Sequence, residues 1–240
     1  MRLSSRFSIA LILLALWLAL AASPALAQDF DIGGDFLIAL PQNEFRDKID
    51  EVGYGVSGHF GFFIGHSPIM IGVDFGYLNY GSEKRHEPFS ETIPDVTVDV
   101  RTTNNILMLH GFVRLQQQEG VVRPYVEGLW GFKYLFTRTS VSDDSFGEPI
   151  ASSTNFDDLA GSWGIGTGID IRLWKQRQPH VRGSLFDLSL NVSARYLWGS
   201  EAEYLKKGSI RRDPDGRVTY LVLRSTTDML IPQVGIRMRF

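Results

Sequence analysis

The sequence predicts an all-β protein, a transmembrane antiparallel up-and-down β-barrel of about eight strands that follows a cleaved signal peptide. Three observations carry this prediction. Apolar residues recur at every second position along most of the chain after Gln28. Short and long connections alternate between the segments that show this pattern. The N-terminal segment has the composition of an export signal.

The N-terminal segment is the first element. Two arginines precede an apolar run from Ile9 to Ala22, and the small-residue pattern Ala25-Leu26-Ala27 follows it. These are the three parts of a secretory signal peptide. The alternative is a membrane anchor helix, but the run is short for a hydrocarbon core of ~30 Å. We therefore expect residues 1–27 to be a signal peptide and residues 28–240 to form the barrel domain.

The segments with alternating hydrophobicity are the expected strands. They span 30–39, 54–64, 69–81, 104–116, 124–138, 159–174, 185–199 and 226–240. Short connections between them alternate with long ones at 40–53, 82–103, 139–158 and 200–225. Bacterial barrels have short periplasmic turns and long outer loops, so both termini are expected in the periplasm. The last long connection contains the turn sequence Asp213-Pro214-Asp215-Gly216, which predicts a ribbon beyond the membrane.

The final segment separates lipid-facing from interior residues. Val234 and Ile236 share one side, while Arg237 and Arg239 share the other. An arginine at the bilayer midplane costs ~2–4 kcal/mol, so the apolar side must face lipid. A soluble sandwich or lipocalin-like barrel alternates as well, with its apolar face turned inward. Aromatic residues at the outer ends of upward strands favour the membrane barrel, because they form an interfacial girdle: Tyr77, Tyr80, Tyr134, Phe136, Tyr196 and Trp198.

The C-terminus carries a family resemblance. The segment Val234-Gly235-Ile236-Arg237-Met238-Arg239-Phe240 resembles the C-terminal signature of bacterial outer-membrane barrels. The mature chain resembles the small outer-membrane barrels of the OmpA, OmpX and opacity-antigen type. This resemblance implies a place in the outer membrane of a Gram-negative-type bacterium. It also implies that Phe240 is an assembly signal recognised by the barrel-assembly machinery. It implies nothing about activity.

Charged residues fall at interior positions under this register. The acids are Asp31, Asp35, Asp74, Glu127, Asp170 and Asp187, and the bases are Arg114, Lys133, Arg172, Arg195, Arg237 and Arg239. An eight-stranded barrel is only wide enough for side chains to fill it. Buried charges persist when they are paired, so we expect a charge-paired and closed lumen. The alternative is a gated path for protons or ions.

Composition and motifs limit the chemistry. The chain has no cysteine, and 24 Lys+Arg stand against 27 Asp+Glu, so thiolate metal sites are excluded and a nucleic-acid partner is not expected. His59 and His110 point inward without a metal-ligand spacing. A hydrolase needs a serine, a histidine and an acid within hydrogen-bond reach. His66 and Ser67 are adjacent but lie in a short turn. We therefore assign no catalytic, cofactor or metal-binding residue.

The outer loops segregate charge. The second and third long connections are acidic, and the fourth is basic. The loops can pair with one another, or the basic residues can contact lipopolysaccharide phosphates: Lys206, Lys207, Arg211, Arg212 and Arg217. We expect a monomeric, non-enzymatic surface barrel in contact with outer-membrane lipid and lipopolysaccharide. It would serve membrane integrity or bind a host or cell-surface ligand through its loops. The alternatives are a porin-like channel for ions or small solutes and a lipid A-modifying enzyme.

Overall fold

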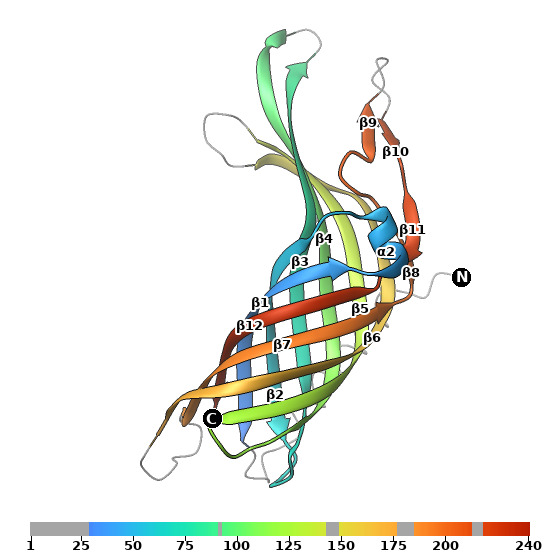
Figure 1. Ribbon diagram of the computed structural model, residues 1–240. Helices are drawn as coiled ribbons and strands as arrows, with labels where there is room; N and C mark the ends of the chain where they lie inside the picture. The colour runs from blue at the N-terminus through green and yellow to red at the C-terminus, as the bar shows by residue number, and fades with distance from the viewer. Residues whose placement is uncertain (1–28, 91–92, 143–148, 177–184, 213–217) are drawn as a thin grey trace, which may run out of the picture.

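The computed structural model describes residues 29–90, 93–142, 149–176, 185–212 and 218–240. Eight antiparallel strands form a closed barrel in the order β1-β12-β7-β6-β5-β4-β3-β2 (Figure 1). The predicted fold class is therefore confirmed. The predicted signal peptide, residues 1–27, lies outside the described residues.

Four consecutive barrel strands, β3 to β6, are much longer than the other four. Their bounds are β1 Phe30–Pro41, β2 Gly53–Phe63, β3 Ile69–Ser90, β4 Ile93–Gln116, β5 Val122–Ser142, β6 Pro149–Lys175, β7 Asp187–Gly199 and β12 Met229–Arg239. Helix α2 (Asn43–Lys48) follows β1. Four short strands lie between β7 and β12: β8 Glu201–Tyr204, β9 Ile210–Arg212, β10 Val218–Tyr220 and β11 Leu223–Thr226.

Two of the segments that were predicted to be long loops are mostly β-strand. The ranges 82–103 and 139–158 mostly continue β3, β4, β5 and β6, which project beyond the rest of the barrel as paired strands (Figure 1). Lys84 pairs with Arg101, for example, well past the predicted end of β3. Residues 82–90 and 149–158 show no alternation of apolar and polar residues, so the pattern gives no strand signal there. Val96, Val98 and Val100 do alternate with polar residues, and together with the β propensity of Val100 and Thr102 they could have extended the strand predicted from residue 104.

The other two long connections also carry structure. Helix α2 in the first was not predicted, because six residues with a single buried side chain, Phe45, show no helical periodicity. The fourth was predicted as 200–225, and the connection between β7 and β12 spans residues 200–228, here called the arm. In it β8 pairs with β11 and β9 pairs with β10, as the predicted ribbon requires. The predicted turn residues 213–216 lie outside the described part of the chain.

The two ends of the barrel differ. Phe30 and Phe240 exchange backbone hydrogen bonds of 3.1 and 2.9 Å, and their rings stack at 4.9 Å. Strands β2 and β3, β4 and β5, and β6 and β7 connect at this same end, so we call it the turn end. The opposite end, which carries α2, the arm and the long hairpins, is the loop end.

The strand register shows how the wall is staggered. Paired residues lead from Phe30 round the whole barrel and return to β1 at Leu40, ten residues further along the strand. The row passes through Phe62, Ile71, Val113, Gly128, Ile165, Tyr196 and Leu230. Such a stagger requires strands tilted against the barrel axis. A row of paired residues therefore climbs from the turn end to the loop end.

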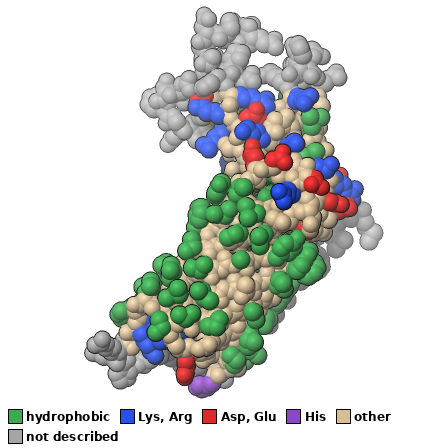
Figure 2. Space-filling view, in the orientation of Figure 1, with side chains coloured by type: hydrophobic (Ala, Val, Ile, Leu, Met, Phe, Trp, Pro, Cys, Tyr) green, Lys and Arg blue, Asp and Glu red, His purple; other side chains and the backbone are tan. Residues whose placement is uncertain are grey.

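The outer wall is apolar, as the alternation predicts. Large exposed side chains include Val56, Phe60, Phe75, Val126, Trp163, Ile165, Val192 and Val234. Figure 2 shows them as a broad apolar zone below a charged loop end. The predicted facing is confirmed on the final strand, where Val234 and Ile236 are exposed while Arg237 and Arg239 are buried. No helix in the described part of the chain is long and apolar enough to cross a membrane.

The predicted aromatic girdle is wrong at one residue. Tyr80 is buried, and its hydroxyl donates a hydrogen bond of 3.1 Å to the Leu205 carbonyl oxygen. The cause is the alternation itself, because Tyr80 lies three residues after the outward-facing Tyr77 and therefore falls on the opposite, inward face, as the buried Leu78 does. The remaining girdle residues stay on the outer face, as the 39% exposure of Tyr77 illustrates.

Candidate functional site

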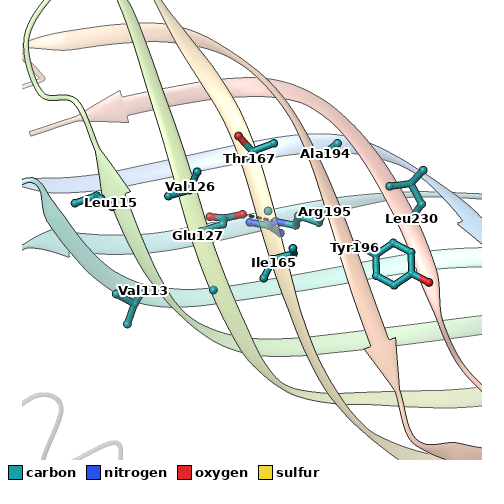
Figure 3. Close-up of a pocket in the computed structure, with 12 residues that line it drawn as sticks. Val113, Leu115, Val126, Glu127, Ile165, Thr167, Ala194, Arg195, Tyr196 and Leu230 are labelled. Carbon is teal, nitrogen blue, oxygen red and sulfur yellow. Dashed lines mark hydrogen bonds and ion pairs between the residues drawn. The ribbon is translucent and has the colours of Figure 1, made fainter.

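The interior contains an ionic cluster centred on Glu127. Glu127 accepts hydrogen bonds from Arg114 (Nη2 to Oε2, 2.8 Å) and from Arg195 (Nε to Oε1, 2.7 Å). Arg195 also reaches Asp74, with Nη1 at 3.0 Å from Oδ1. These four side chains come from four different strands and are all buried. Figure 3 shows Glu127 and Arg195 pointing at each other from β5 and β7. The cluster therefore ties together strands that are not all neighbours in the sheet.

A second cluster lies nearer the turn end. His59 Nε2 is 2.8 Å from Asp31 Oδ1, and Arg237 donates to His59 Nδ1. Arg237 also pairs with Asp35 at 3.2 Å, and Arg239 lies 3.6 Å from Asp31. The histidine is thus a bridge between a carboxylate and a guanidinium.

A third cluster includes a residue that the sequence reasoning missed. Asp187 accepts from both Arg123 and Arg172 at 2.7 Å. Asp170 accepts from Asn191 at 2.8 Å and also from Gln116. Arg123 is fully buried, yet it lies one residue before the predicted start of its strand. Extending the alternation of that strand backwards by one position would have found it.

Lys133 stands apart from these clusters. It is fully buried and donates a 2.6 Å hydrogen bond to the Thr227 carbonyl oxygen. In the described part of the chain it has no carboxylate within ion-pair distance. Asp228, which accepts from the Gly199 backbone at 2.9 Å, acts on it electrostatically.

The half of the interior towards the loop end is mostly apolar, although the buried Thr137 hydroxyl donates a 2.8 Å hydrogen bond to Asn104 there. Its buried side chains include Leu37, Leu78, Ile106, Met108, Leu135, Leu197, Met229 and Ile231. Helix α2 adds Phe45, whose ring lies 5.2 Å from Tyr204 and 6.2 Å from Tyr80. The sequence reasoning missed this layer because both faces of the strands are apolar here. Residues 37–40, Leu-Ile-Ala-Leu, show no alternation.

The basic residues of the arm lie at the loop end. Lys206 Nζ donates to the Lys48 carbonyl oxygen at 3.3 Å, and Lys207 Nζ lies 3.5 Å from Glu51. With Tyr80 and the chain after α2 they line a small cavity of about 190 Å³. Arg211 is exposed and makes no ion pair within the described residues. The side chain of Arg212 and all of Arg217 lie outside the described part.

The arm also contacts the long β3–β4 hairpin. Glu83 accepts a hydrogen bond from the Gly208 backbone at 3.0 Å, and Arg85 donates to the Ile210 carbonyl oxygen at 3.1 Å. The side-chain hydrogen bond from Arg85 to Glu83 (2.9 Å), helped by Gly208, holds the pKa of the Glu83 carboxyl below its usual value. Part of the loop charge is therefore used in contacts between loops.

Among the described residues, a serine–histidine pair occurs at a place that the sequence did not suggest. His110 Nε2 is 3.0 Å from Ser162 Oγ, and both side chains are buried in the interior. The adjacent residues His66 and Ser67 do lie in a turn, where the Ser67 hydroxyl bonds the Ile64 carbonyl oxygen at 2.7 Å. Among the described residues, no group of three or more His, Asp or Glu side chains is placed to hold a metal ion.

Comparisons with known proteins give distant likenesses. No protein-family model and no curated protein matches the chain. Among solved structures, Neisserial surface protein A is 13% identical, with a TM-score of 0.41 over 89% of this chain and 97% of that one. The Yersinia pestis attachment invasion locus protein Ail, solved with the heparin analogue sucrose octasulfate, is 13% identical, with a TM-score of 0.31 over 89% and 97%. A major outer membrane protein of Thermus thermophilus is 9% identical, with a TM-score of 0.36 over 89% and 99%.

Likenesses this distant say nothing of what this chain binds. The conclusion about its class comes from the barrel itself. Its wall is a closed antiparallel sheet without free edges across the apolar zone, its exposed side chains there are apolar, and its charges are turned inward. A sheet with that distribution is stable in lipid and not in water. The chain is a small transmembrane β-barrel of the outer-membrane type.

Proposed function

We propose that the chain is a non-enzymatic and non-conducting surface barrel, with both termini in the periplasm and its functional contacts at the loop end. The observation that supports this is the filling of the interior. Ionic clusters occupy the half towards the turn end, apolar side chains occupy the other half, and Phe45 of α2 packs above them. An ion would have to cross an apolar layer whose only buried cation is Lys133 among the described residues.

The channel alternative is tested by conductance in planar bilayers. The purified wild-type protein is expected to stay silent under an applied potential. A variant with Phe45→Ala, Leu135→Ala and Leu197→Ala thins the apolar layer and serves as the matched opened form. Steady openings of the wild type that depend on the solute would overturn the proposal.

We also propose that the basic arm contacts the phosphates of lipopolysaccharide through Lys206, Lys207, Arg211, Arg212 and Arg217. The exposure of Arg211 supports this, since an unpaired guanidinium is suited to phosphate. Lys206 and Lys207 also line the small cavity at the loop end, where the Lys207 side chain is 53% exposed. The contact would serve membrane integrity by tying the loops to the lipid headgroups.

Retention of lipopolysaccharide through purification tests the arm. A variant with Arg211, Arg212 and Arg217 changed to Gln is expected to retain several-fold less than the wild type. Arg224→Gln is the matched control, because Arg224 lies on the same arm but already pairs with Glu201 at 2.8 Å. Equal retention by the triple variant and the control would show that the arm does not hold lipopolysaccharide.

The enzyme alternative has one feature that favours it, the pair of His110 and Ser162. Both residues are enclosed by the barrel wall, so a lipid substrate has no route to the hydroxyl group. We therefore expect lipid A isolated from cells with and without the protein to have the same acyl composition. A changed acyl pattern that depends on Ser162 would establish an enzyme instead.

A further inference from the structure

The outer wall carries a trough that neither the fold nor the proposed function requires. It has a volume of about 640 Å³ and crosses β4, β5, β6, β7 and β12 on the lipid-facing side (Figure 3). Two adjacent rows of paired, outward-facing residues form it. One row is Val113, Gly128, Ile165, Tyr196 and Leu230, and the other begins Leu115, Val126, Thr167 and Ala194.

The trough exists because its central positions are small. Gly128 has no side chain, and a Cβ added there would meet no atom within 4 Å. Thr167 and Ala194 follow on the neighbouring strands, whereas Ile165 and Val126 beside them are more than half exposed. In the next row towards the loop end, Trp130, Trp163 and Trp198 are paired across β5, β6 and β7. The rings of Trp163 and Trp198 stack at 4.1 Å, so an aromatic ridge borders the trough.

The lining offers a polar ligand little beyond the Tyr196 hydroxyl, which already accepts a 3.1 Å hydrogen bond from Asn43. The Thr167 hydroxyl is already used, since it donates to the Tyr125 carbonyl oxygen at 3.0 Å. Glu127 and Arg195 border the trough, but their side chains are buried and bond each other at 2.7 Å. The remaining lining is hydrocarbon or aromatic. The occupant must therefore be apolar where it touches the wall.

The position and length of the trough suit one acyl chain. Four interstrand steps of ~4.8 Å make it ~19 Å long. At a strand tilt of ~35–45° it rises by ~11–13 Å along the barrel axis, which fits within the ~15 Å that one leaflet contributes to a hydrocarbon core of ~30 Å. In the row that climbs from Phe30 to Leu40, it occupies the part from Val113 to Leu230, towards the loop end. At its upper end the Tyr196 hydroxyl accepts a 3.1 Å hydrogen bond from Asn43, so the trough opens at the polar boundary.

We propose that this trough is a binding site for one acyl chain of a membrane lipid in the leaflet on the loop side. The lipid lies along the small residues, with the tryptophan ridge on one side and its headgroup near Tyr196. The site goes beyond the proposed function, because it acts through the wall and not through the loops. A second copy of this chain, inserting its own tryptophan ridge, is the competing occupant.

The test fills the trough and counts bound lipid. Gly128→Leu places a side chain in the open space. The matched control is Gly58→Leu on β2, which is also exposed on the outer wall and whose added Cβ would make only an ordinary 3.6 Å contact with the Gly33 carbonyl oxygen. Each protein is folded into detergent micelles with palmitoyl-oleoyl phosphatidylethanolamine, and native mass spectrometry measures the lipid retained as detergent is increased. Heat-dependent migration on gels verifies folding, and Ala194→Leu is the second variant if Gly128→Leu fails to fold.

Wild type and Gly58→Leu are expected to retain one lipid at detergent concentrations where Gly128→Leu retains at least ten-fold less. Phosphatidylglycerol with the same chains should be retained equally well, because the wall holds the chain and not the headgroup. Equal retention by Gly128→Leu and the control would overturn the proposal, as would retention that follows the headgroup. A wild-type dimer that Gly128→Leu dissociates would assign the trough to a second copy instead.

Discussion

Glu127 is held between two guanidinium groups inside the barrel. Arg114 and Arg195 each lie within 2.8 Å of one of its oxygens, and all three side chains are buried. Arg172 provides a contrast, because its bond to Asp187 is partly exposed and Asp187 keeps a second partner in Arg123. Loss of Glu127 would therefore leave two buried guanidinium groups without their shared carboxylate, whereas loss of Arg172 would leave Asp187 paired with Arg123.

We expect Glu127→Gln to lower the free energy of unfolding by about 3 kcal/mol or more, since two buried cations lose their shared carboxylate. Arg172→Gln should cost less than about 1 kcal/mol. Urea unfolding in phospholipid vesicles measures both. Similar losses for the two variants would mean that the cluster at Glu127 is not a buried network.

Lys133 leads to the opposite expectation. It lies in the apolar half and bonds one carbonyl oxygen, that of Thr227. Replacing a buried charge with an apolar group of similar size is often neutral or stabilising. Lys133→Met should therefore leave the free energy of unfolding unchanged within about 1–2 kcal/mol in the same assay. A loss as large as that of Glu127→Gln would show that Lys133 belongs to an essential ionic pair.

At this scale, the sequence predicts side-chain direction better than it predicts partners. Alternation places Glu127 and Arg195 inside, but they are far apart in the sequence, and only the closed register brings them to 2.7 Å. Alternation also places Tyr80 inside, three residues after the outward-facing Tyr77, so the girdle prediction for Tyr80 was wrong because it did not follow the period-two pattern of its own strand.

Helix α2 acts through a single buried side chain. Phe45 is fully buried against Tyr80 and Tyr204, which come from β3 and the arm. Phe45 is the only buried residue of the helix, so this ring is its main apolar anchor, beside hydrogen bonds such as that from Asn43 to Asp228 Oδ2 (2.7 Å).

Phe45→Ala is expected to release α2 and β8 from the rest of the protein. Amide exchange in residues 43–48 and 201–204 should accelerate by an amount equivalent to about 3 kcal/mol, while the barrel strands keep their protection. Phe36→Ala on the outer wall, where the side chain is 48% exposed, is the control and should leave these amides unchanged. Unaltered exchange in Phe45→Ala would exclude the anchoring role.

Glu83 makes the contact between the β3–β4 hairpin and the arm sensitive to acid. Its pKa is lowered in the folded protein by the hydrogen bonds from Arg85 and Gly208. The stabilisation is therefore fully present above the usual glutamate pKa of ~4.3 and is lost as the pH falls through the folded value.

We expect the protection factor of the Gly208 amide to fall in this acid range and to be constant near neutral pH. Glu83→Gln should abolish the dependence, because the amide cannot titrate there. A Gly208 protection factor that falls equally in Glu83→Gln would assign the acid response to another group.

The observed strand bounds agree with the bounds predicted from the sequence where one face of the strand meets lipid and the other meets the interior. Strand β7 was predicted as 185–199 and is found as Asp187–Gly199. The ends of β3 and β6 were missed because both faces there meet water, and hydrophobicity no longer alternates. Helix α2 is too short to show a period of its own.

The side chains of the barrel form three distinct environments. Lipid meets the apolar outer wall, ionic clusters fill the interior towards the turn end, and an apolar layer under α2 fills the interior towards the loop end. The closed barrel was predictable because one pattern recurs along the chain. The apolar layer was not, because residues such as Leu37 and Leu197 extend the hydrophobicity to both faces.

The central claim is that alternate residues of one strand face lipid and a sealed interior, and single-cysteine scanning of β7 tests it directly. The chain has no cysteine, so each introduced thiol is unique. In vesicles, a cysteine at Val192, which is 44% exposed, should react only with a membrane-soluble maleimide. Cysteines at the buried neighbours Asn191 and Ser193 should react with neither that reagent nor a charged, water-soluble one. Labelling of position 192 by the charged reagent, or of 191 and 193 by the membrane-soluble one, would contradict the account.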